Sequence, residues 1–367
     1  MRKCYAVSLK RKSEGAWNMV TMKDIAAEAG VSRGTVDRVL NNRGRVAPDK
    51  EKRIREIAEK LGYRPNPAGK GLAARKKQLK IGFIYVKNAA APFHMAVYRA
   101  AQEYAVELEQ YGVEVLFFPV TRAIENNEEW IRMFETLIPA RPQIDGWAVL
   151  GLAADSLVTW LKMRGEGTVP VVTYNLDSSC EWKLAYVGCD YRQAGRLACG
   201  VASLMTDAQG KVCILSMDPG NIQSSAERIE GFEDEMKDRY PDMEIVDKIF
   251  FGMEGYYESV KGDLMKKLEE YSGIDVIYLV NPGDYSICEY ISRTEMPHRV
   301  KIITNDLITG EQWEMVRNEK IAVTICQEPE KQGRKPLEIL FDYLALGREP
   351  DTAWYKTELS INIAQNL

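Results

Sequence analysis

Long apolar runs and histidine are scarce in this sequence of 367 residues. No stretch comes close to the ~18 consecutive apolar residues of a membrane-spanning helix. Residues 1–18 are basic but lack the apolar segment of a secretory signal, so we expect a disordered basic extension there. Only two histidines occur, which leaves few residues for a zinc site or a catalytic triad. These absences predict a cytoplasmic protein that does not contact the membrane.

Closely spaced cysteines and nucleotide-binding motifs are also missing. The seven cysteines include no Cys-x-x-Cys pair, and their odd number favours scattered reduced thiols. Neither a phosphate-binding Walker loop nor the Gly-x-Gly-x-x-Gly motif of dinucleotide-binding domains occurs. We therefore predict no catalytic residues, no cofactor and no metal ligands.

Charge is unevenly divided along the chain. Residues 1–80 hold 21 Lys and Arg against 8 Asp and Glu, a net charge of +13. The remainder holds 28 against 45, a net charge of −17. Because nucleic-acid phosphates attract a basic segment and repel an acidic one, the pattern predicts DNA binding by the N-terminal segment alone.

Two short helices joined by a tight turn are predicted over residues 21–40. Thr21 can cap the first helix together with Asp24, and Gly30 can adopt the positive φ that closes it. Ser32 can cap the second helix, whose inward face is apolar. The outward face would then present base-reading side chains near the start of a recognition helix: Arg33, Gly34, Thr35, Asp37 and Arg38.

A third helix and an extended linker are predicted next. Pro48 suits the first turn of this helix, and Gly62 ends it. Two prolines keep residues 63–67 extended. The short basic segment that follows contains Gly69 and Gly71, so it has little intrinsic helix propensity.

Strands and helices alternate from residue 79 onward. The predicted strands are 80–86, 113–120, 146–150, 169–174, 211–215, 247–251, 276–280 and 300–304, and predicted helices are 95–110, 126–138, 225–237 and 257–270. Such alternation predicts parallel sheets joined by right-handed crossovers. Because the rhythm restarts near residue 211, we expect two similar α/β lobes. Their ligand should lie between them, at the carboxyl ends of the strands.

The chain from about residue 20 to its end resembles the LacI/GalR family of bacterial transcriptional regulators. The matching segments include Val20-Thr21-Met22-Lys23-Asp24-Ile25-Ala26, Ala29-Gly30-Val31-Ser32 and Leu61-Gly62-Tyr63-Arg64-Pro65-Asn66. The resemblance implies an α-helical helix-turn-helix headpiece followed by a two-lobed α/β domain like the periplasmic binding proteins, with Rossmann-like parallel sheets. It also implies a homodimer on pseudopalindromic, double-stranded operator DNA.

The same resemblance implies a division of the chain. After the extension at 1–18, it places the helix-turn-helix domain at 19–66, the hinge at 67–78 and the effector-binding domain at 79–367. In that domain, the N-lobe is 79–188 with 326–350, and the C-lobe is 189–325 with 351–367.

DNA-binding residues follow from the same match. The implied contacts are Thr21, Ser32, Arg33, Gly34, Thr35, Arg38, Asn41 and Arg45, with Leu72 wedged into the minor groove. Asp37 departs from the serine that is common in the family. It would accept a hydrogen bond from a cytosine amino group or pair with Arg33 or Arg38, and we favour the pairing.

Effector-binding residues are implied on several strand ends and helix starts. They are Phe93, His94, Asn175, Arg228, Asn281, Asp306 and Gln327. Carboxylate, amide and guanidinium groups suit the vicinal hydroxyls of a neutral polyol, and an aromatic face suits its apolar side. Phe93 could instead belong to the core, and Asn175 could simply cap the next element.

We interpret the chain as a repressor whose affinity for its operator is controlled by a sugar or sugar derivative. An activator, or a regulator with a purine-type corepressor, remains open as an alternative. An enzyme built on the α/β lobes and a transport binding protein are the hypotheses from other classes. The effector, the operator and the choice between dimer and tetramer are left open.

Overall fold

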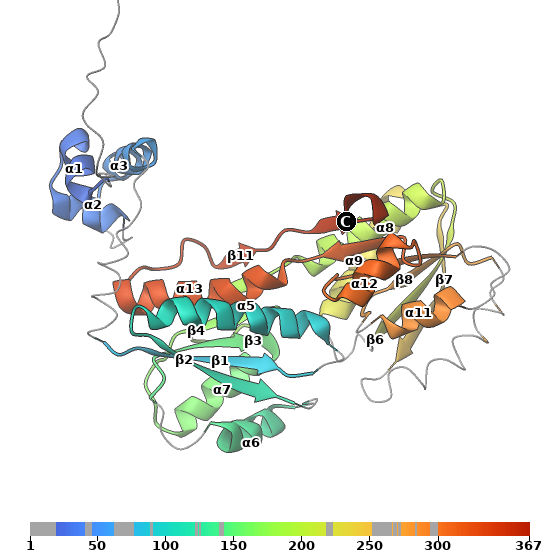
Figure 1. The fold of residues 1–367 in the computed structure, drawn as a ribbon, viewed down its shortest axis with the longest axis horizontal. Coiled ribbons are helices and arrows are strands. Elements are labelled where there is room, and N and C mark those ends of the chain that lie inside the picture. Colours follow the sequence, from blue (N-terminus) through green and yellow to red (C-terminus); the bar gives the residue numbers. More distant parts are fainter. Residues whose placement is uncertain are drawn as a thin grey trace, which may run out of the picture. The chain divides into compact units, whose positions relative to one another are not determined.

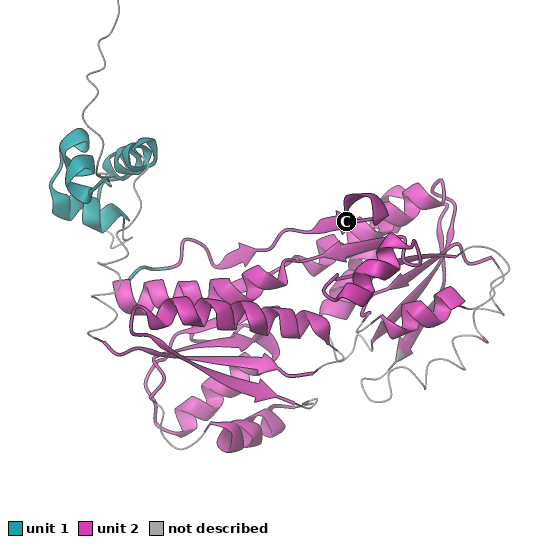
Figure 2. Ribbon diagram, in the orientation of Figure 1, with its two compact units in different colours: residues 1–70, 347–349 teal, residues 71–346, 350–367 magenta. Residues whose placement is uncertain are grey.

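Two compact units make up the chain: residues 1–70 with 347–349, and residues 71–346 with 350–367 (Figure 2). The computed structural model describes residues 20–40, 46–61, 77–88, 91–121, 124, 126–138, 143–217, 223–251, 266, 270, 273–282, 285–293 and 300–367. The predicted extension at 1–18 and most of the predicted hinge at 67–78 lie outside these residues. So do three predicted DNA contacts: Asn41, Arg45 and Leu72.

Three helices form the described part of the N-terminal unit: α1 (Met22–Ala29), α2 (Arg33–Leu40) and α3 (Pro48–Lys60) (Figure 1). Apolar side chains three or four residues apart on each helix face inward. The buried core comprises Ile25, Ala26, Ala29, Val36, Val39, Ile54 and Ala58. The two helices and the turn predicted over 21–40, and the third helix, are confirmed.

The first sheet of the larger unit has the strand order β11-β5-β4-β3-β1-β2, and all its pairs are parallel. Its strands are β1 (Lys80–Val86), β2 (Glu114–Val120), β3 (Gly146–Leu150), β4 (Val171–Tyr174), β5 (Lys183–Gly188) and β11 (Trp354–Lys356). Both faces are covered, which explains why these strands are apolar runs without alternation.

Helices cover the two faces of this first sheet in pairs. Phe83 points to the face on which α5 (Pro92–Glu109) and α13 (Pro329–Leu346) pack side by side (Figure 1). The next residue, Ile84, belongs to the core under α6 (Asn127–Leu137) and α7 (Gly151–Met163). Successive side chains on a strand point to opposite faces, so one strand contributes to both cores.

The second sheet repeats this plan with the order β12-β10-β9-β8-β6-β7. Its strands are β6 (Lys211–Met217), β7 (Glu244–Phe251), β8 (Val276–Leu279), β9 (Lys301–Asn305), β10 (Val323–Cys326) and β12 (Ser360–Asn362). Only β12 is antiparallel to its neighbour. The predicted pair of α/β lobes with parallel sheets is confirmed.

Helices also cover both faces of the second sheet. One core lies under α8 (Tyr191–Met205) and α9 (Gln223–Arg239), and the other under α11 (Ser286–Arg293) and α12 (Gly310–Arg317). A short 3-10 helix, Ala364–Asn366, follows β12. The helix predicted over 257–270 lies, apart from Lys266 and Glu270, outside the described residues.

Three segments cross between the lobes: β5 to α8, β10 to α13, and β11 to β12. The third crossing corrects the predicted lobe boundaries. Residues 351–367 were assigned to the C-lobe, but Trp354 pairs with Tyr186 in the first sheet, so that assignment is wrong for β11. Strand β11 pairs with the otherwise unpaired edge of β5 before the chain crosses to the second lobe. Cys326, assigned to the N-lobe, instead pairs with Ser360 in the second sheet.

None of the helices in the described ranges is both long and apolar enough to span a membrane. The six cysteines in those ranges carry free thiols, and five of them are buried. Five of these six cysteines therefore belong to the packed interior.

Candidate DNA-binding face and effector site

Local hydrogen bonds fix the start and end of α1. The Asp24 carboxylate accepts from the Thr21 N–H at 2.8 Å and from its hydroxyl at 2.7 Å. These bonds from Thr21 hold the pKa of Asp24 below its usual range. Gly30 ends the helix with φ 66°, and the Val31 N–H donates to the Ala26 carbonyl at 3.0 Å. The geometry of the turn is therefore set by residues within it.

The start of α2 presents an exposed polar face. Ser32 Oγ accepts from the Thr35 N–H at 3.1 Å, and the two hydroxyls lie 2.9 Å apart. Arg33, Gly34 and Arg38 are exposed, and Arg38 Nε donates to the Gly34 carbonyl at 3.2 Å. We call Ser32, Arg33, Gly34, Thr35 and Arg38 the outer face of α2. The structure brings these five together on α2 and the residue that precedes it, and their contact with DNA remains a prediction.

In the larger unit, a carboxylate and an amide meet near the crossing from β10 to α13. Asp306 directly follows β9, with φ 61°, and its carboxylate accepts from Gln327 Nε2 at 3.2 and 3.4 Å. Gln327 Oε1 in turn accepts from the Cys189 thiol at 3.2 Å. Burial raises the pKa of Asp306 to about 6, although Arg228 and Gln327 act in the opposite direction. This carboxyl therefore titrates close to neutral pH.

Arg228 on α9 is a buried cation with few partners. Its side chain is 4% exposed, and its guanidinium carbon lies 4.8 Å from the centre of the Tyr191 ring. One nitrogen, Nη1, reaches the Val280 carbonyl at 3.4 Å. Among the described residues, Nε has no hydrogen-bond partner and the guanidinium has no carboxylate within 4.0 Å. A buried charge left in this state is costly, so it favours a ligand that supplies an acceptor.

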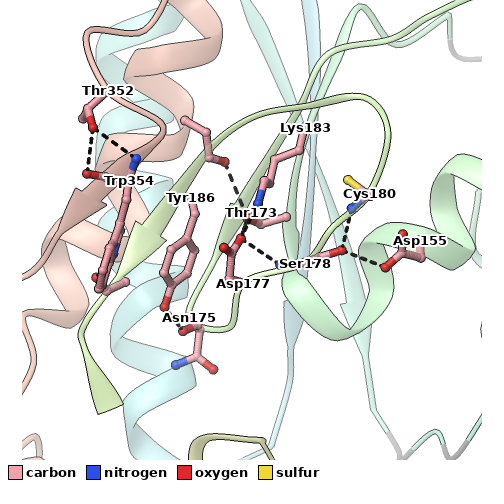
Figure 3. A network of polar contacts seen from close by, with 12 residues as sticks. Asp155, Thr173, Asn175, Asp177, Ser178, Cys180, Lys183, Tyr186, Thr352 and Trp354 are labelled. Carbon is pink, nitrogen blue, oxygen red and sulfur yellow. Dashed lines mark hydrogen bonds and ion pairs between the residues drawn. The ribbon is translucent and has the colours of Figure 1, made fainter. Parts of the chain in front are cut away.

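Asn175 follows β4 and is held by two tyrosines. With φ 64°, it turns the chain, and its carbonyl accepts from the Tyr186 and Tyr191 hydroxyls, both at 2.7 Å. Its side-chain amide donates to the Tyr191 oxygen at 3.0 Å. Figure 3 shows Asn175 beside Tyr186, at the edge of a polar network around Asp177. We call Asn175, Cys189, Tyr191, Arg228, Asp306 and Gln327 the crossing cluster.

Among the described residues, no hydrogen bond or ring contact joins Phe93 or His94 to this cluster. Both begin α5, and their rings meet edge to face at 5.6 Å. Phe93 is 9% exposed and belongs to the core of the first lobe, which was the alternative to a role in effector binding. Burial lowers the pKa of His94 to about 4, so its imidazole is neutral at pH 7. Effector contact by either ring remains a prediction.

Asn281 has a structural role within the second lobe. Its side-chain oxygen accepts from the Met217 N–H at 3.0 Å and from the hydroxyls of Ser216 and Ser225, at 3.1 and 2.9 Å. These bonds tie the end of β8 to β6 and to the start of α9. The described contacts therefore join Asn175, Arg228, Asp306 and Gln327 through shared neighbours, while Asn281 supports the strand ends.

Cys189 and Tyr191 were not predicted as site residues. They flank Asp190 immediately after β5, in the first crossing. The rule that ligands bind at the carboxyl ends of parallel strands could have indicated them. Their partners are 138 and 16 residues away in the chain, however, and no local spacing signals such contacts.

Two family descriptions match this chain. Residues 21–66 match bacterial regulatory proteins of the lacI family, and residues 81–349 match the periplasmic binding protein domain. The first match covers the three-helix unit and the second covers most of the two lobes. Together they account for both units of the fold.

Several curated proteins are similar to this chain in sequence. The chain is 33% identical to the HTH-type transcriptional regulator KdgR of Bacillus subtilis (strain 168) over 128 residues, 35% of each chain. It is 23% identical to the ribose operon repressor of Lactococcus lactis subsp. lactis (strain IL1403) over 300 residues, 80% of this chain and 83% of that protein. The chain spans 35%, 50% and 60% of the length of the first three curated relatives it matches.

A solved structure shares the fold of the larger unit. GanP, a glucose-galactose binding protein from Geobacillus stearothermophilus, matches with a TM-score of 0.65 and 21% sequence identity. The match covers 79% of this chain and 98% of that one. It supports the two-lobed architecture described above.

Proposed function

This chain belongs to the family of proteins with a periplasmic binding protein domain, and its residues 21–66 match the lacI family of bacterial regulatory proteins; we propose that it is an effector-controlled transcriptional repressor. One observation carries the proposal. The same chain joins an exposed recognition-type helix, within a segment of net charge +13, to a buried polar cluster with unused hydrogen-bonding capacity. The first feature suits DNA and the second suits a small molecule.

The DNA partner is double-stranded operator DNA, read by the outer face of α2. Arg33 and Arg38 offer guanidinium forks for guanine edges or phosphates, and Thr35 offers a hydroxyl and a methyl group. Two such units in a homodimer would read a pseudopalindrome, with half-sites related by the dimer axis. The ribose operon repressor, by its name, supports repression rather than activation. A protein that binds operator DNA must reach the bacterial chromosome, so the proposal includes a cytoplasmic location.

The effector is a sugar or a sugar derivative bound by the crossing cluster. Asp306 supplies an anionic hydrogen-bond acceptor, and Arg228 Nε supplies an unused donor. The side-chain amides of Asn175 and Gln327 each supply donors and an acceptor. Vicinal hydroxyls act as donor and acceptor together, so they match this combination. GanP is named as a glucose-galactose binding protein, which supports carbohydrate as the ligand class. No catalysis is assigned to the site.

Regulation requires that the effector favour one arrangement of the lobes. A ligand with equal affinity for the DNA-bound and free forms would change nothing, however tightly it bound. The crossing cluster draws residues from both lobes, so a ligand there favours the arrangement of the lobes in which those residues lie together. That differential contact is the proposed source of control.

The test begins with selection of binding sites from random double-stranded DNA by the full chain. Operator affinity is then measured by fluorescence anisotropy at fixed salt, with and without ribose, glucose, galactose, gluconate and inositol. We expect enrichment of an inverted repeat and a change of at least about tenfold in affinity with one sugar, which corresponds to ~1.4 kcal/mol of coupling. Enrichment of no sequence would refute DNA reading. Unchanged affinity across the panel would refute the sugar effector alone.

A further inference from the structure

We propose that Tyr191 is a positioning residue that holds the ligand-facing groups of the two lobes, Asn175 and Arg228, in one arrangement. The inference deepens the proposed function and rests on it only for the identity of the ligand. Asn175 and Arg228 have no direct hydrogen bond in the described structure, and Tyr191 contacts both.

Tyr191 is firmly placed in the first crossing. It is the first residue of α8, which Asp190 caps by accepting from the Gln193 N–H at 2.9 Å. Its side chain is 3% exposed and packs with Leu176 and Cys189. A buried ring at the start of a capped helix has little freedom, so it can fix the groups that touch it.

The hydroxyl of Tyr191 controls the first-lobe side of the arrangement. It donates to the Asn175 carbonyl at 2.7 Å and accepts from the Asn175 amide at 3.0 Å. Two reciprocal hydrogen bonds fix the backbone turn after β4 and the side-chain amide together. Tyr186 donates to the same carbonyl at 2.7 Å but does not bond the amide.

The ring of Tyr191 controls the second-lobe side. The Arg228 guanidinium carbon lies 4.8 Å from the ring centre, a distance typical of a cation–π contact. This contact satisfies a face of the guanidinium without using its N–H groups. Nε stays free for an acceptor on a ligand.

Close packing of α8 on α9 makes the distance between ring and guanidinium reproducible. A Cβ on Gly195 would lie 1.9 Å from the Arg228 carbonyl oxygen, and one on Gly231 would lie 2.0 Å from the Arg192 carbonyl oxygen. Arg192 also bonds the Asp234 carboxylate at 2.5 and 2.9 Å. The two helices therefore move together, and Tyr191 carries their position to Asn175.

The first test measures coupling between Asn175 and Arg228 without any ligand. Asn175→Gly keeps the positive φ and removes the amide, and Arg228→Met removes the charge. A double-mutant cycle on the denaturant unfolding of the full chain gives their coupling, and the cycle is repeated with Tyr191→Phe and with Tyr186→Phe. We expect a coupling of roughly threefold or more in the unfolding equilibrium constant, retained with Tyr186→Phe and lost with Tyr191→Phe. Coupling that is absent from the parent chain, or survives Tyr191→Phe, would overturn the inference.

The second test uses the sugar identified from the panel, by calorimetric titration of the same full-length chains. Tyr191→Phe removes two hydrogen bonds to Asn175, so we expect roughly a tenfold loss of sugar affinity, against about twofold for Tyr186→Phe. Equal losses would overturn the positioning role. If no panel sugar binds the parent chain while the unfolding cycle behaves as expected, the sugar effector is refuted and the role of Tyr191 stands.

Discussion

Asp306 and Gln327 are joined by a hydrogen bond of 3.2 Å from Nε2 to Oδ1, which links the end of β9 to the crossing into α13. The amide of Gln327 is held on its other side by Cys189, from the crossing after β5. Two of the three crossings thus meet at Gln327, whose amide donates to the Asp306 carboxylate. Its charge depends on pH near neutrality, because burial raises its pKa to about 6. Effector binding should therefore be linked to protons.

Sugar affinity is expected to fall as the pH drops from 7 to 5. Hydroxyls that donate to Asp306 prefer its ionised form, so the bound state has the lower pKa and binding releases a proton below about pH 6. Affinity should be constant above that pH and fall by up to about tenfold per unit below it. Calorimetry across this range measures the effect. Asp306→Asn should bind more weakly with a flat profile, and a profile that stays steep in this variant would refute the assignment.

Arg228→Met should separate binding from stability. Loss of a charged donor costs about 1.5–3 kcal/mol, so sugar affinity should fall roughly 10–100-fold. The melting temperature should stay level or rise, because the substitution removes a buried charge that has no carboxylate partner among the described residues. Thermal unfolding and calorimetry on one preparation give both values. A large drop in melting temperature would instead make Arg228 a structural residue.

Substitutions on the outer face of α2 should remove sequence preference before they remove binding. A base contact is worth ~1–3 kcal/mol, so Arg38→Ala combined with Thr35→Ala should cost at least roughly tenfold on the selected operator. Binding to unrelated DNA should change little, because phosphates dominate it. Arg55→Ala on α3, where Arg55 pairs with Glu51 at 2.8 Å, is the matched control. Retained preference in the double variant would place the reading face elsewhere.

Two glycines in α8 should respond differently to substitution by alanine. A Cβ on Gly195 would lie 1.9 Å from the Arg228 carbonyl oxygen, whereas a Cβ on Gly200 would have no atom within 4 Å apart from the neighbouring backbone of its own helix. Gly195→Ala should destabilise the protein by about 1–3 kcal/mol through overpacking. Gly200→Ala should be neutral or stabilise it by up to ~1 kcal/mol through helix propensity. Denaturant unfolding measures both, and equal effects would contradict the close packing of α8 on α9.

The sequence predicts what local forces decide. Capping residues, the spacing of apolar residues and one glycine are sufficient to predict α1 and α2 of the N-terminal unit, since each of these signals acts within a few residues. Apolar strands between helices are sufficient for the two parallel sheets. Helix α5 begins at Pro92, three residues before the predicted start at residue 95, because proline is well accommodated at the first helical position.

Contacts between distant segments could not be predicted in the same way. Strand β11 joins the first sheet because it satisfies the edge of β5, and a three-residue strand has no periodicity to reveal its partner. Tyr191 and Cys189 gain their importance from partners in other segments. Asn281 matched a ligand motif, yet its oxygen is used by Ser216, Met217 and Ser225. The position of a residue in a sequence motif does not by itself show whether its side chain contacts a ligand or supports the neighbouring strands.

Reciprocal linkage tests the central claim most directly. Coupling between two sites changes each ligand's affinity by the same factor. The affinity for the sugar is measured on the full chain with and without saturating operator, at one salt concentration. The proposed function predicts that the operator shifts the sugar's dissociation constant by the same factor, at least about tenfold, by which the sugar shifts that of the operator. Identical sugar affinities with and without operator would contradict it.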